Sequence, residues 1–112
     1  MSAIPLAIPK EFLKTFCERN YIRKLSLFGS VLTTRFRPDS DLDVLVEFDA
    51  GHVPGLVTLA GMEMELSEAF GRKVDLRTPE DLSRYFRNEV VSSALAQFER
   101  LPRMFYADSP RL

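Results

Sequence analysis

The sequence is poor in cysteine and histidine, with one residue of each, and it has no tryptophan. The single cysteine, Cys17, excludes an intramolecular disulfide, and its apolar helical surroundings predict a small buried side chain. Because the chain has only one histidine and one cysteine, it also lacks a cluster of such ligands for zinc or copper. His52 lies in a Gly-rich loop, so we expect it to face solvent rather than to act in catalysis.

A strong charge of one sign is also missing. The chain has 15 Lys and Arg against 16 Asp and Glu, a net charge of −1, which gives no bulk attraction to nucleic acid. A basic surface for an RNA acceptor remains an alternative, but its cations are scattered over several predicted elements, which favours solvated surface charge. They are Arg19, Arg23, Lys24, Arg35 and Arg37.

No segment approaches the roughly 20 apolar residues that cross a bilayer, and the first ten residues lack a basic region before an apolar run. We therefore expect no membrane insertion, no export and a cytoplasmic location. The 112 residues suit one domain over 1–112, with a core over about 11–100 and an irregular tail over 101–112.

Hydrophobic periodicity predicts an alternation of helices and strands in the order α-β-α-β-α-β-α. The predicted helices cover residues 11–20, 31–36, 56–70 and 88–100, with a further helical start at 78–81, and the predicted strands cover 24–28, 42–48 and 73–77.

The clearest strand carries an Asp-x-Asp pair. Asp41 and Asp43 alternate with Leu42 and Val44, so both carboxylates point to one side of the strand while the apolar residues point to the core. In the next strand Val74 and Leu76 belong to the core side. The strand pattern therefore predicts that Asp75 shares the polar side.

Three carboxylates that converge in this way repel one another unless a cation compensates them. Magnesium prefers oxygen ligands and commonly uses one or two carboxylates together with substrate phosphates. Gly29 and Ser30 supply the matching phosphate turn, because glycine admits a phosphate to the backbone and a helix start offers free N–H donors. The order of strand, phosphate turn, loop and acidic strand is that of a site for magnesium and a triphosphate.

These motifs resemble the nucleotidyltransferases of the DNA polymerase beta superfamily, and most closely its minimal, antitoxin-type members. The resemblance rests on LFGS at 27–30, PDSDLDVLVEF at 38–48 and KVDLRTPEDL at 73–82. It implies an α/β (α+β) nucleotidyltransferase fold with a small mixed sheet flanked by helices. It also implies Gly29 and Ser30 at the triphosphate, Asp41 and Asp43 as ligands of two Mg²⁺ ions, and Asp75 as the remaining ligand.

The resemblance further implies an activity and a partner. By this resemblance we expect ATP as the substrate, AMP as the transferred group and, as the acceptor, a HEPN-type toxin ribonuclease that the modification silences in a toxin–antitoxin pair. One departure bears on the substrate: Val31 and Thr34 stand where minimal members commonly have arginine and glycine. Arg35 or Arg37 can supply the missing charge from the neighbouring turn.

Other interpretations of the aspartates are weaker. Asp39, Asp41 and Asp43 have calcium-loop spacing, but Val44 and Ala50 occupy the positions that need glycine and glutamate. Asp43 can alternatively form a plain ion pair with Arg77 or Lys73 across the sheet.

The alternative function is a catalytically weak or inactive binding module that keeps the nucleotidyltransferase fold and neutralises a partner by contact. The apolar cluster at 104–106, Met104, Phe105 and Tyr106, is then a docking site rather than a plug for the core.

Overall fold

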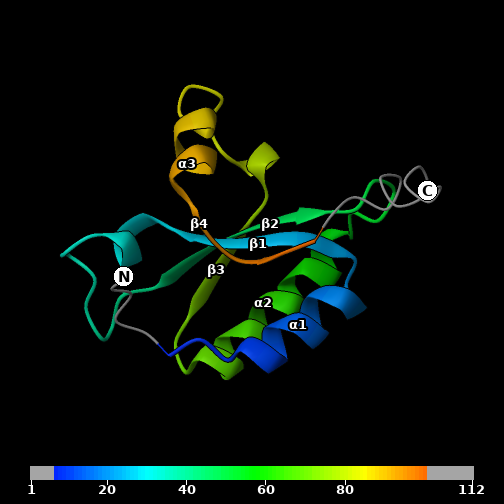
Figure 1. Ribbon diagram of the computed structural model, residues 1–112, viewed down its shortest axis with the longest axis horizontal. Coiled ribbons are helices and arrows are strands. Elements are labelled where there is room, and N and C mark those ends of the chain that lie inside the picture. The colour runs from blue at the N-terminus through cyan, green and yellow to red at the C-terminus, as the bar shows by residue number, and fades with distance from the viewer. Residues whose placement is uncertain (1–6, 101–112) are drawn as a thin grey trace, which may run out of the picture.

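The structure is a computed structural model that describes residues 7–100. Helices and strands alternate along this part of the chain (Figure 1). The elements are α1 (Lys10–Arg19), β1 (Ile22–Phe28), the 3-10 helix η1 (Gly29–Leu32), β2 (Leu42–Phe48), α2 (Leu56–Phe70), β3 (Val74–Arg77), the 3-10 helix η2 (Pro79–Asp81), α3 (Arg87–Ser93) and β4 (Leu95–Glu99).

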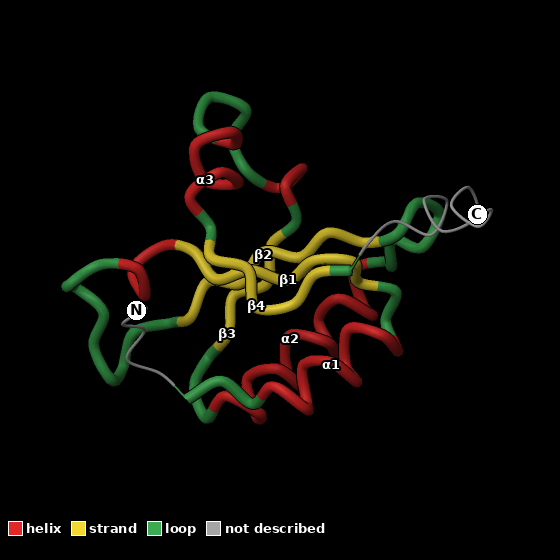
Figure 2. The backbone as a smooth tube through the Cα atoms, in the orientation of Figure 1, coloured by secondary structure: helices red, strands yellow, loops and turns green. Residues whose placement is uncertain are grey.

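The four strands form one mixed sheet in the order β3-β2-β1-β4. β1 runs antiparallel to both β2 and β4, whereas β2 and β3 are parallel. Helices α1 and α2 cover one face of the sheet, and η2 and α3 stand on the opposite side (Figures 1 and 2). The predicted small mixed sheet flanked by helices is confirmed.

The core lies between the sheet and the pair α1 and α2. The predicted apolar face of β2 is confirmed, because Leu42, Val44 and Val46 are fully buried. The polar face is not uniformly open, since Leu45 is 1% exposed although it alternates with the acidic residues. At Leu45 both faces of β2 are therefore buried, and this burial stabilises β2 inside the sheet.

The predicted final helix over 88–100 is wrong in its second half. Helix α3 ends at Ser93, Ala94 takes an extended conformation, and the chain continues as β4. Ala, Leu and Gln favour a helix locally, but pairing with β1 satisfies backbone groups that would otherwise lie open at a sheet edge. Phe98, predicted on the buried side of that helix, instead packs against the core from β4.

Two other predicted helices are shorter than expected. The helix over 31–36 is replaced by η1, because the Thr33 hydroxyl donates to the carbonyl of Ser30 at 2.8 Å and accepts the N–H of Arg35 at 3.1 Å. Such side-chain bonds compete with helix continuation. The predicted start at Thr78 is present as a capping box, but only the single turn of η2 follows it.

The remaining predictions for this part of the chain concern His52 and Cys17. His52 is exposed, as expected, and stacks on Tyr21 with ring centroids 4.0 Å apart. Cys17 is fully buried, also as expected. Between residues 7 and 100, no helix combines the length and apolar character needed to cross a membrane. Met104, Phe105 and Tyr106 lie outside the described residues.

Candidate functional site

Two of the predicted aspartates, Asp43 and Asp75, lie side by side on adjacent strands. β2 and β3 pair in parallel so that Asp43 lies directly opposite Asp75, with Leu42 opposite Val74 on the alternating face. The same alternation buries Leu42 and Val74 and leaves both aspartates half-buried on the other side. The juxtaposition of Asp43 and Asp75 follows directly from strand register.

The glycine of the predicted phosphate turn lies against Asp43, at the end of β1. Gly29 follows β1, where Phe28 is the register partner of Asp43, and it has a φ of +80°. A Cβ placed on Gly29 would overlap Oδ2 of Asp43. Both the positive φ and the close approach to a carboxylate therefore require glycine at this position.

The electrostatics of Asp43 indicate a site suited to a cation. Burial raises the pKa of Asp43, the neighbouring Asp75 raises it further, Arg77 opposes the rise, and Asp41 adds to it. Carboxylates gathered on one face thus disfavour the ionised form of Asp43 in the protein alone. A hard cation would relieve that repulsion, and the donors present, carboxylate oxygens, are those that magnesium prefers.

Asp41 lies at the edge of this cluster, just before β2. Its side chain is 51% exposed and lies 4.0 Å from the ammonium of Lys73. Arg77 pairs with Asp75 at 3.4 Å, so the predicted cross-sheet cations are present but contact the two outer aspartates instead of Asp43. Among the described residues, no three acidic, His or Cys side chains lie close enough to hold a metal ion by themselves. Magnesium sites that include substrate phosphates need fewer protein ligands than three.

A hollow of about 570 Å³ opens beside the phosphate turn. Gly29, Ser30 and Arg35 line it on one side. Glu89, Val90 and Ser93 of α3 line it on the other. Its size lies in the range of small-molecule sites, and its walls combine backbone groups, the cation of Arg35, the carboxylate of Glu89 and apolar surface.

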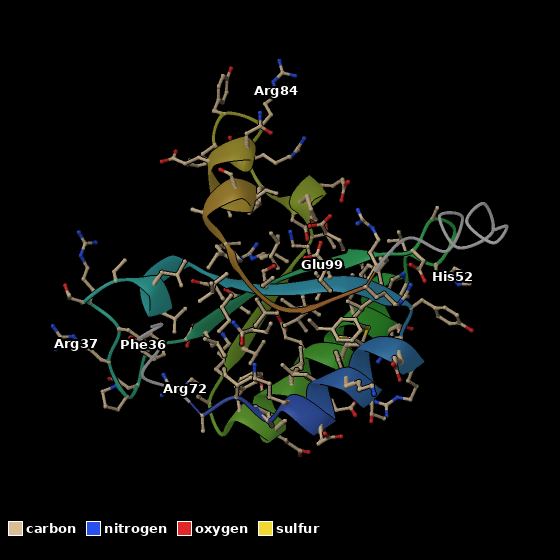
Figure 3. The ribbon with its side chains drawn as sticks, in the orientation of Figure 1. Phe36, Arg37, His52, Arg72, Arg84 and Glu99 are labelled. Atoms are coloured by element: carbon tan, nitrogen blue, oxygen red, sulfur yellow. The ribbon has the colours of Figure 1, made fainter. Side chains whose placement is uncertain are left out.

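Arg35 is the cation of that hollow. Val31, at the position where arginine was missing from the sequence pattern, is 3% exposed and belongs to the core. An arginine side chain at position 31 would have to leave the core to reach a phosphate. The structure therefore favours Arg35 as the replacement and leaves Arg37, which points outward in Figure 3, away from the hollow.

Helix α2 holds the strand that carries Asp75. The N–H of Leu76 donates to Oε2 of Glu63 at 2.7 Å, and the N–H of Val74 donates to Oγ of Ser67 at 2.9 Å. These two donors lie on the edge of β3 that faces away from β2 and would otherwise lack a strand partner. Sequence periodicity assigned Glu63 only to a helix face and missed this role.

The α3 wall of the hollow was also missed, because Val90 was assigned to the buried side of a long helix. The signal was present in the spacing of 89, 90 and 93, which places these side chains on one helical face. Only the fold shows that this face looks toward Gly29 and Ser30.

Similarity to known proteins extends over most of the chain. Residues 9–97 match the family model described as "Nucleotidyltransferase domain". Protein adenylyltransferase MntA of Thermococcus cleftensis is 35% identical over 63 residues, which are 56% of this chain and 62% of that protein.

Solved structures share the fold. A chain in the crystal structure of a toxin–antitoxin with AMP-PNP matches with a TM-score of 0.66 at 19% identity, over 83% of this chain and 75% of that one. A chain in the structure of a tri-AMPylated Shewanella oneidensis HEPN toxin in complex with an MNT antitoxin matches with a TM-score of 0.58 at 19% identity, over 81% and 70%. At this identity the likeness concerns the fold.

Proposed function

Because the chain belongs to the nucleotidyltransferase domain family, we propose that it transfers AMP from ATP to a protein acceptor. The observation that carries the proposal is the convergence of Gly29 on the Asp43 and Asp75 pair beside a hollow of nucleotide size. Phosphate turn, carboxylates and hollow occupy one side of the sheet. That arrangement suits a triphosphate whose α-phosphate lies at the carboxylates.

In the proposed reaction, a hydroxyl oxygen of the acceptor attacks the α-phosphorus of ATP. A bond from that oxygen to phosphorus forms, the bond to the β-phosphate oxygen breaks, pyrophosphate leaves, and the hydroxyl proton passes to a nearby base. Asp41, Asp43 and Asp75 are the residues that would hold two Mg²⁺ ions. Bound magnesium would neutralise charge on the leaving pyrophosphate and lower the pKa of the attacking hydroxyl.

The protein's own groups account for binding and orientation. Gly29 leaves room for the phosphates, Ser30 adds a hydroxyl and backbone donors, and Arg35 offers a charge from the same wall of the hollow. We place Asp75 at the attacking hydroxyl, because it lies on β3 directly opposite Asp43 and therefore at the side of the proposed metal site.

The acceptor in this proposal is a HEPN-type toxin, and the chain is its antitoxin. The support comes from the similarity to an adenylyltransferase and from the shared fold with toxin–antitoxin complexes, one of which contains a tri-AMPylated HEPN toxin.

The test is transfer of label from ATP. Purified protein is incubated with magnesium, host extract and ATP labelled either at the α- or at the γ-phosphate, and the products are separated on a denaturing gel. We expect a protein band labelled only from α-labelled ATP, and no band with the Asp41→Asn, Asp43→Asn double variant. Asp75→Asn should abolish transfer while nucleotide binding survives in part. A band that persists in the double variant would overturn the proposal.

A further inference from the structure

Arg72, in the connection between α2 and β3, joins that connection to the loop that precedes β2. Its Nη1 donates to the carbonyl oxygen of Arg37 at 3.2 Å and to that of Ser40 at 3.1 Å. Its guanidinium carbon also lies 4.5 Å from the ring centroid of Phe36. Figure 3 shows Arg72 and Phe36 side by side at this end of the molecule. One side chain thus contacts three residues of the loop.

These contacts bear on Asp41, which lies between two anchored neighbours. Arg72 holds the carbonyl of Ser40 on one side of Asp41, and the N–H of Leu42 on the other side donates to the carbonyl of Lys73 at 2.9 Å. Consecutive residues of one connection therefore fix both peptide units that flank Asp41. We infer that Arg72 is a positioning residue that sets the place of Asp41 at the site, an inference that rests on the proposed transfer reaction.

The loop has internal bonds, but these do not attach it to the sheet. The N–H of Ser40 donates to the carbonyl of Arg37 at 3.0 Å, and the N–H of Arg37 donates to the hydroxyl of Ser40 at 2.9 Å. This turn would keep its shape if it moved as a unit. Arg72 ties it to the α2–β3 connection.

The ion pair of Lys73 with Asp41 is too weak to replace Arg72. Its atoms are 4.0 Å apart, and the two side chains are 72% and 51% exposed. Exposed pairs of this kind contribute about 0–1 kcal/mol. Hydrogen bonds from a charged group, together with stacking on an aromatic ring, are stronger and more directional. Arg72 is therefore the principal link between the 37–40 turn and the neighbouring connection.

The test compares Arg72→Met with Arg72→Lys and with the matched control Arg19→Met. Arg19 also pairs with an oxygen of another element, Glu65 at 2.6 Å, and lies 5.9 Å from the ring centroid of Phe16, but it is on α1, away from the site. Lysine keeps a charged donor but lacks the planar guanidinium that lies over the Phe36 ring, so Arg72→Lys should recover part of the function.

Trypsin cleavage after Arg35 gives a readout that does not depend on activity. Arg37 precedes Pro38 and resists trypsin, so Arg35 reports on the loop. We expect Arg72→Met to speed this cleavage about tenfold at an unchanged melting temperature, by freeing the loop. Affinity for α,β-methylene-ATP with magnesium is measured alongside, because that analogue cannot undergo transfer.

In the transfer assay we expect Arg72→Met to lower kcat by about 10- to 100-fold with a smaller change in KM for ATP. Arg72→Lys should lie between Arg72→Met and the unaltered chain, and Arg19→Met should match the unaltered chain. Equal cleavage in Arg72→Met and Arg19→Met overturns the inference, and so does faster cleavage at an unchanged kcat. If the unaltered chain transfers no nucleotide, the proposed function fails. The inference about Arg72 is then decided by cleavage and analogue affinity alone. A positioning role requires faster cleavage and a weaker affinity for the analogue in Arg72→Met than in Arg19→Met, and an unchanged value of either overturns it.

Discussion

Gly29 and Gly51 share a backbone conformation but differ in their surroundings. Their φ angles are +80° and +81°, and only a Cβ on Gly29 meets another group, the carboxylate of Asp43. Alanine at either position should destabilise the fold by about 1 kcal/mol, since a non-glycine residue disfavours this conformation. We expect Gly29→Ala alone to reduce transfer, by about 100-fold, because Asp43 must move.

Urea unfolding and the transfer assay, run on Gly29→Ala and Gly51→Ala together, check this expectation. Gly51→Ala is the matched control for backbone strain. Equal activity in the two variants would show that the contact between Gly29 and Asp43 has no part in catalysis.

Arg35 is expected to bind the triphosphate from the wall of the hollow. Arg35→Gln should raise KM for ATP by about tenfold. A charge-assisted hydrogen bond is worth about 1.5–3 kcal/mol, and the exposure of Arg35 places its contribution at the low end of that range. Arg37→Gln, two residues away and outside the hollow, should leave KM unchanged. Initial-rate kinetics at varied ATP decide the matter. A larger effect of Arg37→Gln would transfer the role to that residue.

Among single residues, the sequence predicted those whose position follows from strand alternation or from a turn. Strand alternation puts Asp43 and Asp75 on a polar face, and a glycine at a strand end predicts a turn. Arg72 and Glu63 could not be predicted in the same way. Their contacts join segments that are 13 to 35 residues apart in the chain, and such contacts follow from the packing of α2 on the sheet.

Among the elements, α2 is expected to stabilise β3 through its side chains. Ser67→Ala removes the acceptor of the Val74 N–H and should lower the free energy of unfolding by about 1–2 kcal/mol. Ser92→Ala, on the exposed surface of α3, is the control and should change it by less than about 0.5 kcal/mol. Urea titration followed by circular dichroism measures both. Equal changes would mean that water replaces the hydroxyl of Ser67 at the strand edge.

Elements with a strong period were predictable, and those formed by distant pairing were not. α2 has a continuous helical pattern, and it ends where predicted, with Gly71 in the left-handed conformation. β4 lies in a stretch whose composition favours a helix, but β1 offers it an open edge more than 65 residues earlier in the chain. Local propensity cannot include that pairing, so the predicted helix continued past Ser93.

The molecule as a whole keeps one thiol in its core. Burial raises the pKa of Cys17 from an ordinary 9.0 to about 12, although Arg100 opposes the rise. The folded protein then retains a proton that the unfolded chain releases above pH 9. The resulting stability is present below pH 9 and declines as the pH rises toward 12, by at most about 1.4 kcal/mol per pH unit.

Comparison with Cys17→Ala isolates this effect from the titration of lysines and tyrosines. The free energy of unfolding should fall more steeply for the unaltered chain than for Cys17→Ala between about pH 8 and about pH 10.5. Urea unfolding at several pH values gives both slopes. Parallel slopes would show that the folded structure does not shield the thiol.

The candidate site lies on the side of the sheet opposite α1 and α2, where the phosphate turn, the acidic strands and α3 lie close together (Figure 1). The layers were predicted from the family resemblance, and the buried faces of α1, α2 and β2 agree with them. The hollow was not, because its second wall requires the path of the chain from η2 through α3 to β4.

The most direct test of the central claim is the mass of the modified acceptor. The protein band labelled in the transfer assay is isolated, and its intact and peptide masses are compared with those of the same protein exposed to the Asp41→Asn, Asp43→Asn variant. We predict a gain of one or more whole AMP groups on a hydroxyl side chain, with release of pyrophosphate. An unchanged mass, or a gain of phosphate alone, would contradict nucleotidyl transfer by this site.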